Sequence, residues 1–296
     1  MARAETPPAR GIPLAKTRKA RRSFSPRYPA WLTFPSLFYY ALFFLGPLSI
    51  LVLFSLAIQS GFGSVTYAFS SEQFSQVIDP LYLKIFRQTL LMAAGGTVLT
   101  ILIGYPIAYW MARYLSTYKM LVLLLLIVPF WTSFLIRTYA LQIILDPQGY
   151  LATYLNFQSL YTWKAVAIGL VYNYLPLLII PVYASLERMD WTLVEAATDL
   201  GASPSRAFRQ ITLRLTMPGL VTGALLVFIP MCGEFIIPNI LGGGRFQFVG
   251  TAIGDTFGQA QNWPFGAALS ISLMIALSVF MIIYILFATK EERFGA

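Results

Sequence analysis

Six long apolar runs without a charged side chain constrain the fold of this chain more than any other feature. They cover residues 31–58, 88–111, 120–136, 165–186, 215–233 and 263–289. Each approaches or exceeds the roughly 20 residues that a helix needs to cross the hydrocarbon core of a bilayer. The composition agrees, because 57% of the residues are hydrophobic, 11% are charged and the mean hydropathy is +0.68. The sequence therefore predicts an all-α integral membrane protein with six transmembrane helices.

Two of the predicted helices are expected to continue past an ionisable residue. The third should run beyond Arg137 to about residue 145, and the fifth beyond Glu234 to about residue 240. A charged side chain is costly inside a bilayer, so both residues need a specific environment.

The distribution of Lys and Arg predicts the orientation, since positively charged short loops stay in the cytoplasm. With both termini inside, the segments assigned to the cytoplasm hold most of the 21 basic residues. The same placement accounts for the net charge of +9 without nucleic acid, because basic residues at the inner surface meet anionic lipid headgroups. We therefore predict a multi-pass protein with both termini in the cytoplasm and no nucleic-acid partner.

The predicted organisation is one membrane domain with short ends. Residues 1–29 are rich in Arg, Pro, Ala and Ser, so they are expected to form a disordered basic cytoplasmic tail. Residues 30–290 form the six-span domain, and residues 291–296 form the cytoplasmic C-terminus. The outer segment 59–84 is too polar to span and has room for a short helix. With one cysteine, Cys232, and no histidine, the chain is predicted to hold no disulfide, metal site or catalytic residue.

One polar segment, EAATDLGASPSRAFRQITLRL at residues 195–215, lies between two of the apolar runs. Helical character up to Leu200 ends at Gly201, which suits the left-handed position after a helix. Ser203 and Pro204 then suit the N-cap and the first residue of a second, basic helix. The segment is predicted to form a helical hairpin at the cytoplasmic surface.

Three interpretations of this hairpin compete. A DNA-binding helix-turn-helix is disfavoured, because transmembrane runs adjoin the segment on both sides without a linker. A passive amphipathic loop on the membrane surface is the plainest alternative. The third is a docking element for a soluble partner, since Ala196, Ala197, Gly201 and Ala202 form a small-residue surface that another protein can approach closely.

At these residues the sequence resembles the EAA loop in the permease subunits of bacterial binding-protein-dependent ABC importers. The pattern of that loop is E-A-A, three residues, G, nine residues, I, one residue and L-P. Glu195, Gly201, Ile211 and Leu213 fall in register with it. The last position departs from the pattern, because Arg214 stands where the family usually has proline.

Two further segments narrow the resemblance to the spermidine/putrescine branch of these permeases. PFWTSFLIRTYA at residues 129–140 and GEFIIPNILGG at residues 233–243 are similar to signature segments of its first permease subunit. The resemblance extends over the six predicted spans and leaves the N-terminal tail unmatched.

The resemblance implies a type I ABC importer permease fold in the bacterial cytoplasmic (inner) membrane, which forms half of a translocation pathway for a polyamine-like cation. The hairpin, at about residues 187–214, would be the coupling helix that contacts an ATPase through Glu195, Ala196, Ala197, Gly201, Ala202 and Ser203. The implied partners are a second permease in a heterodimer, an ATPase dimer and a periplasmic or lipid-anchored solute-binding protein. The chain has no phosphate-binding loop, so ATP and Mg are expected on the partner ATPase and no cofactor on this chain.

With a polycationic cargo, five residues become candidates for lining the translocation pathway: Glu234, Phe235, Trp131, Tyr139 and Arg137. Glu234 could pair with Arg137, face the cargo among aromatic rings, or lie at the lipid edge without a role. Arg137 could face the interior or extend to the outer headgroups. The alternatives for the whole chain are an importer permease for another organic solute and a secondary transporter.

Overall fold

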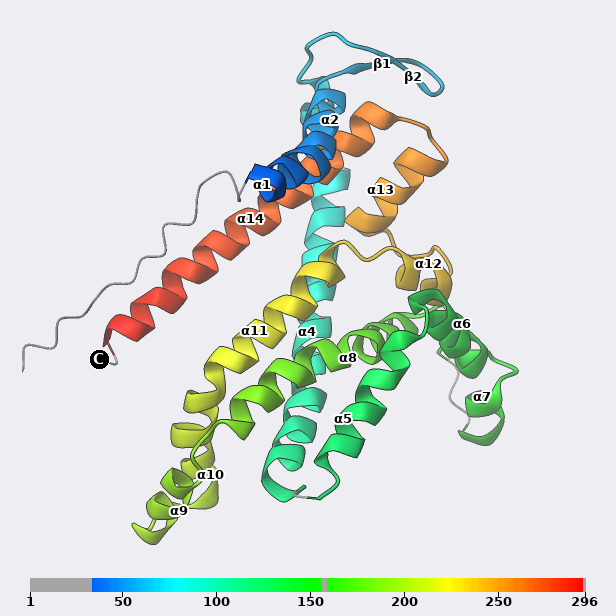
Figure 1. Ribbon diagram of the computed structural model, residues 1–296. Coiled ribbons are helices and arrows are strands. Elements are labelled where there is room, and N and C mark those ends of the chain that lie inside the picture. The colour runs from blue at the N-terminus through cyan, green and yellow to red at the C-terminus, as the bar shows by residue number, and fades with distance from the viewer. Residues whose placement is uncertain (1–33, 116, 156–158, 295–296) are drawn as a thin grey trace, which may run out of the picture. The chain divides into compact units, whose positions relative to one another are not determined.

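The computed structural model describes residues 34–115, 117–155 and 159–294, so the predicted tail at 1–29 lies outside the described residues. The chain divides into two units, residues 1–47 and residues 48–296. The first apolar run forms α1 (Phe34–Tyr40), a π-helical turn η2 (Ala41–Leu45) and α2 (Gly46–Ser55). The second unit holds the remaining elements and is described below (Figure 1).

Among the described residues, five helices are long and apolar enough to cross a membrane, and a bent helix pair raises the number to six. The long helices are Phe34–Ser55, α4 (Pro80–Tyr114), α8 (Trp163–Glu187), the continuous stretch Pro204–Cys232 and Trp263–Tyr284 within α14 (Trp263–Phe294). The bent pair joins Lys119–Trp131 to α6 (Phe134–Leu145). The predicted class, a six-span helical membrane protein, is confirmed.

The third span is bent where the sequence predicted a continuous helix. It consists of α5 (Lys119–Ile127), a 3-10 turn η3 (Val128–Trp131) and α6. The helix axis bends by 96° between the two parts. Pro129 lies in the 3-10 turn, where its missing N–H weakens the helix. Thr132 and Ser133 are extended, so the direction of the chain changes there.

The prediction that the fifth span continues past Glu234 to about residue 240 is wrong. The helix ends at Cys232, and a separate short helix, α12 (Ile236–Gly242), follows. Pro238 gives the physical reason, because in a continuous helix its ring would clash with the carbonyl group of Glu234, four residues earlier. Glu234 therefore lies in a break between two helices.

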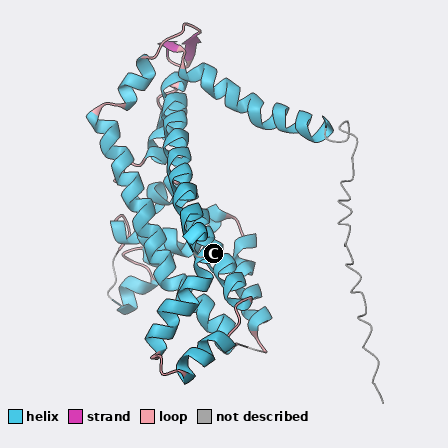
Figure 2. Ribbon diagram, turned by 90° about the vertical axis from the view of Figure 1, so that its left-hand side faces the viewer, coloured by secondary structure: helices cyan, strands magenta, loops and turns pink. Residues whose placement is uncertain are grey.

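At one end of the second unit the chain forms small elements between the spans. A two-stranded antiparallel hairpin, β1 (Ile58–Gly61) and β2 (Ser64–Thr66), pairs Gln59 with Val65 and is drawn in magenta in Figure 2. The short helix expected in this segment is α3 (Glu72–Val77), while the strands were not predicted. Two more helices also lie between the spans: α7 (Tyr150–Leu155) follows α6, and α13 (Val249–Gly258) precedes α14.

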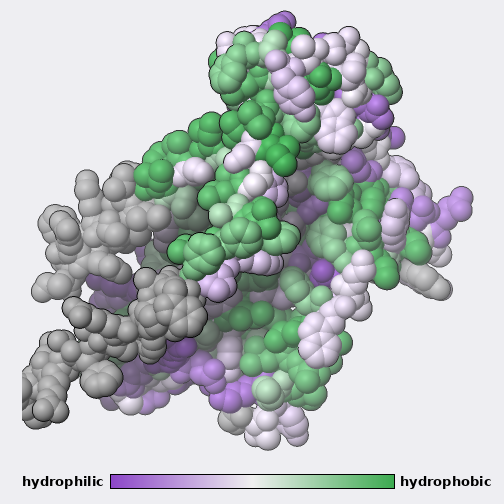
Figure 3. Space-filling view, turned by 45° about the horizontal axis from the view of Figure 1, so that its top comes forward, coloured by the Kyte–Doolittle hydropathy of each residue, from purple (hydrophilic) through white to green (hydrophobic). Residues whose placement is uncertain are grey.

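The core of the second unit is formed where α4, α8 and α11 (Leu213–Cys232) pack together. Leu178 and Ile179 of α8 and Met231 of α11 are fully buried. A buried hydrogen bond of 2.9 Å between the hydroxyl groups of Tyr105 and Thr216 also joins α4 to α11. Hydrophobic side chains cover much of the face in Figure 3, as expected for a protein surrounded by lipid.

Gly250 marks a close approach between α13 and the break at Glu234. A Cβ atom at Gly250 would lie 2.5 Å from the carbonyl oxygen of Gly233 and 2.8 Å from that of Glu234. Both neighbours are backbone atoms, so they cannot rotate away. The start of α13 therefore holds the break in place.

Gly250→Ala should lower the midpoint of thermal unfolding of the purified protein in detergent, because overpacking of this kind costs about 1–3 kcal/mol. Gly95→Ala is the matched control, since a Cβ atom there meets no other heavy atom within 4 Å. Alanine should favour the α4 helix at Gly95 by roughly 0.5–1 kcal/mol. Equal midpoints for the two variants would contradict the close approach.

Candidate functional site

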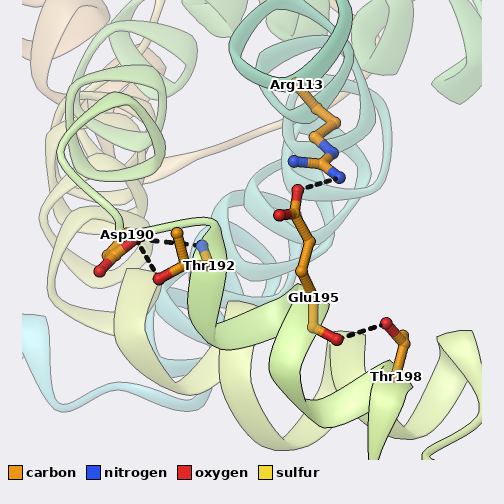
Figure 4. A network of polar contacts seen from close by, with 5 residues as sticks. All are labelled: Arg113, Asp190, Thr192, Glu195 and Thr198. Atoms are coloured by element: carbon orange, nitrogen blue, oxygen red, sulfur yellow. Dashed lines mark hydrogen bonds and ion pairs between the residues drawn. The ribbon is translucent and has the colours of Figure 1, made fainter.

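The polar segment forms a helical hairpin, as predicted. Helix α8 ends at Glu187, and α9 (Thr192–Asp199) begins after a short break. The carboxylate of Asp190 accepts hydrogen bonds from the Thr192 backbone N–H at 3.0 Å and the Thr192 hydroxyl at 2.8 Å (Figure 4). The hydroxyl, and then the backbone N–H, lower the pKa of Asp190 below its usual value. The carboxylate of Asp190 thus satisfies the backbone N–H of the first residue of α9.

The turn of the hairpin has the backbone conformation that the sequence predicted. Gly201 has φ +87°, as its position after a helix predicted. Ser203 is extended and Pro204 is the first residue of the next helix, although the Ser203 side chain makes no capping hydrogen bond. Its hydroxyl lies 3.4 Å from that of Ser205 instead.

The second arm of the hairpin is continuous with the fifth span. It begins as α10 (Pro204–Ala207), passes through a π-helical turn η4 (Phe208–Thr212) and becomes α11. A movement of this arm is therefore transmitted directly to a transmembrane helix.

Most of the predicted coupling residues lie at the surface of the hairpin. Glu195, Ala196, Gly201 and Ser203 are exposed, while Ala197 and Ala202 are partly buried. The sequence analysis missed Leu200, an apolar side chain that is 89% exposed beside the turn. Its position directly before the glycine was the available signal.

Aromatic rings hold the inner side of the hairpin against α4. Tyr109 contacts Trp191 and Phe208 edge to face, with ring centroids 5.7 Å apart in both pairs. Tyr105 contacts Phe208 in the same way at 5.8 Å. We call these four residues the aromatic anchor. Such contacts contribute about 0.5–1.5 kcal/mol each beyond the buried area.

An ion pair adds to the aromatic anchor. The Nη2 atom of Arg113, near the end of α4, donates to the Oε1 atom of Glu195 at 3.2 Å (Figure 4). The guanidinium group of Arg113 also lies over the Trp191 ring, 4.8 Å from its centroid. The Glu195 side chain remains 60% exposed, so its carboxylate also faces solvent.

Glu234 forms a second polar site, in the break between α11 and α12. The hydroxyl of Tyr174 on α8 donates to its Oε2 atom at 2.5 Å. The backbone N–H groups of Ile236 and Ile237 donate to Oε1 at 2.9 and 3.3 Å. Glu234 is only 6% exposed, and its carboxylate is placed at the positive end of α12.

Arg137 is 8% exposed and lies in the interior of this chain. Of its two predicted positions, the interior and the outer headgroups, the structure shows the first. Its guanidinium group lies over the rings of Phe130 and Phe134, at 4.7 and 5.8 Å. In the described part of the chain it forms no ion pair with Glu234, and its Nε atom has no hydrogen-bond partner. The predicted alternative of an Arg137–Glu234 pair is therefore wrong in this structure.

The three aromatic candidates for the pathway are all exposed. Trp131 is 83%, Tyr139 52% and Phe235 45% exposed. Among the ring contacts of the described residues, none joins these side chains to one another. Likewise, the described residues include no group of three potential metal ligands from His, Cys, Asp or Glu.

The family of the chain follows from comparison with known proteins. Residues 101–291 match the family described as binding-protein-dependent transport system inner membrane component. The chain belongs to this family of multi-pass permeases, and the predicted resemblance is confirmed.

Individual relatives agree with this assignment. The chain is 40% identical to the spermidine/putrescine transport system permease protein PotB of Escherichia coli over 228 residues, which is 74% of this chain and 83% of that protein. The identity to PotB of Haemophilus influenzae is 39% over 232 residues, 75% of this chain and 81% of the relative. A crystal structure of a bacterial ABC transporter for the import of alginate has the same fold, with a TM-score of 0.63 and 16% identity, and covers 89% of this chain and 96% of that chain.

Gly201→Val should uncouple the hairpin, because a β-branched residue at φ +87° is strained by at least about 1–2 kcal/mol. A Cβ atom there meets no other atom within 4 Å, so the cost comes from the backbone alone. Solute uptake by the assembled transporter should fall several-fold. Gly201→Asn is the control and should keep most of the uptake, since asparagine tolerates this conformation. Normal uptake by the valine variant would contradict a role for the turn.

Proposed function

We propose that this chain is a permease subunit of an ATP-driven importer for spermidine, putrescine or a similar polyamine. The observation that carries this proposal is the 40% identity to PotB, which extends over 74% of the chain. Further support comes from the hairpin, whose turn, exposed surface and continuity with α11 suit a coupling element. An importer permease for another organic solute is the alternative.

In this proposal ATP and Mg bind to a separate ATPase dimer, and this chain has no enzymatic activity of its own. The ATPase covers the tip of the hairpin, where Leu200 presents a large apolar surface to solvent. A second permease completes the pathway, and a solute-binding protein docks on the opposite side. Both termini are then cytoplasmic, and the hairpin of β1 and β2 faces outward.

The cargo would pass over aromatic rings near the break at Glu234. Phe235 follows this glutamate and is half exposed, and exposed rings can bind ammonium groups through cation–π contacts. Glu234 itself is turned toward Tyr174 and the start of α12. Its carboxylate thus fixes the backbone that carries Phe235, and it adds negative potential beside the path of a cation.

Uptake of labelled spermidine and putrescine tests the proposal, in cells that lack other polyamine importers and express the chain with its ATPase, sister permease and binding protein. Glu234→Gln keeps an acceptor for the backbone N–H groups of α12 and removes the charge. We expect normal amounts of complex with uptake reduced at least several-fold. Tyr174→Phe is the matched variant, since it removes the hydroxyl and leaves the charge. Absence of polyamine uptake by the parental complex would contradict the proposal.

Leu200→Asp should reduce the amount of ATPase that copurifies with the chain, because it places a charge in an apolar contact. Asp199→Asn, at the neighbouring exposed position, is the control and should retain the ATPase. If the leucine variant copurifies as much ATPase as the parental chain, the docking site lies elsewhere.

A further inference from the structure

Two basic residues on either side of the turn between α4 and α5 bind the segment around the hairpin. Arg113 precedes the turn and pairs with Glu195 on α9 at 3.2 Å. Lys119 follows the turn, and its Nζ atom donates to the Oε1 atom of Glu187 at 2.7 Å. These are the ion pairs found in the described residues.

The two carboxylates lie on opposite sides of a break in the chain. Glu187 is the last residue of α8, while Glu195 belongs to α9 beyond the break at residues 188–191. A break between two helices is where their relative orientation can change. The α4–α5 turn therefore bridges this break through one ion pair on each side.

Ring packing supports the bridge within the break itself. Trp191 lies in the break, with the Arg113 guanidinium group over its ring and Tyr109 packed against it edge to face. Both ion pairs are partly exposed, so neither contributes much to the stability of the fold on its own. Their effect is to fix the geometry rather than to supply most of the stability.

The position of α5 gives this bridge a mechanical consequence. From Lys119, α5 leads into η3 and then, after the 96° bend, into α6 with the buried Arg137. A displacement of the hairpin can therefore be transmitted to the transmembrane helices by two routes. One route is the second arm of the hairpin, which continues into α11. The other runs through the ion pairs to α5 and the third span.

We propose that Arg113 and Lys119 are positioning residues that make the hairpin, the end of α8 and the adjoining ends of α4 and α5 move as one body. Through this link, movement imposed on the hairpin reaches the bent third span as well as α11. Arg113 also orients the Glu195 carboxylate, whose exposed side then faces a docked subunit. The inference rests on the proposed coupling function of the hairpin.

The test uses the complete transporter reconstituted in liposomes. For each variant we compare the ATPase rate with and without loaded binding protein, and the uptake per ATP hydrolysed. Arg113→Gln and Lys119→Gln should each lower the stimulation of the ATPase at least about twofold and lower uptake per ATP. Arg87→Gln, an exposed arginine near the other end of α4 and outside the hairpin, is the matched control and should match the parental complex.

A charge exchange separates a specific link from general damage. Lys119→Glu alone should impair coupling, and Lys119→Glu combined with Glu187→Lys should restore it, since the pair is remade with opposite polarity. If the parental complex couples but the glutamine variants couple equally well, or if the exchange fails to restore coupling, the proposed link is overturned. If the parental complex shows neither polyamine uptake nor stimulated ATPase activity, the proposed function fails instead.

Discussion

The contact of Tyr109 with Trp191 and Phe208 is the interaction on which the arrangement of the hairpin depends. These rings join α4 to both arms of a segment that is otherwise polar and largely exposed. Without them, α9 would be connected to the bundle mainly through the chain at either end and through one exposed ion pair. The aromatic anchor thus turns an amphipathic loop into an element with a fixed position.

A carboxylate binds freed backbone N–H groups at two of the breaks between helices. Backbone groups freed inside a membrane protein must find new partners, because lipid offers none. At the break after α11, the Glu234 carboxylate accepts from two N–H groups of α12, and Tyr174 binds its other oxygen. At the exposed break after α8, which lies beyond the span, Asp190 accepts a hydrogen bond from the first N–H group of α9. Irregular backbone is therefore found beside a carboxylate in both places.

The sequence predicted the features that depend on local chemistry. Apolar runs predicted the spans, and Gly201 with Pro204 predicted the turn of the hairpin. The prediction that the fifth span runs on past Glu234 was wrong although a signal was present, since Pro238 disfavours a helix through Glu234. The pairing of Arg113 with Glu195 could not be predicted, because the two residues are far apart in the chain and meet only through the packing of α4 against the hairpin.

The most direct test is thiol labelling of introduced cysteines. It asks whether the hairpin lies in the cytoplasm and is covered by the ATPase. The chain suits this measurement because its single cysteine, Cys232, is buried. Leu200→Cys and, as the outer control, Phe62→Cys are treated with a membrane-impermeant maleimide in intact cells and in inverted membranes. The account predicts that Leu200→Cys reacts only in inverted membranes and is protected when the ATPase is present, while Phe62→Cys reacts only in intact cells. Labelling of Leu200→Cys from outside, or equal labelling with and without the ATPase, would contradict it.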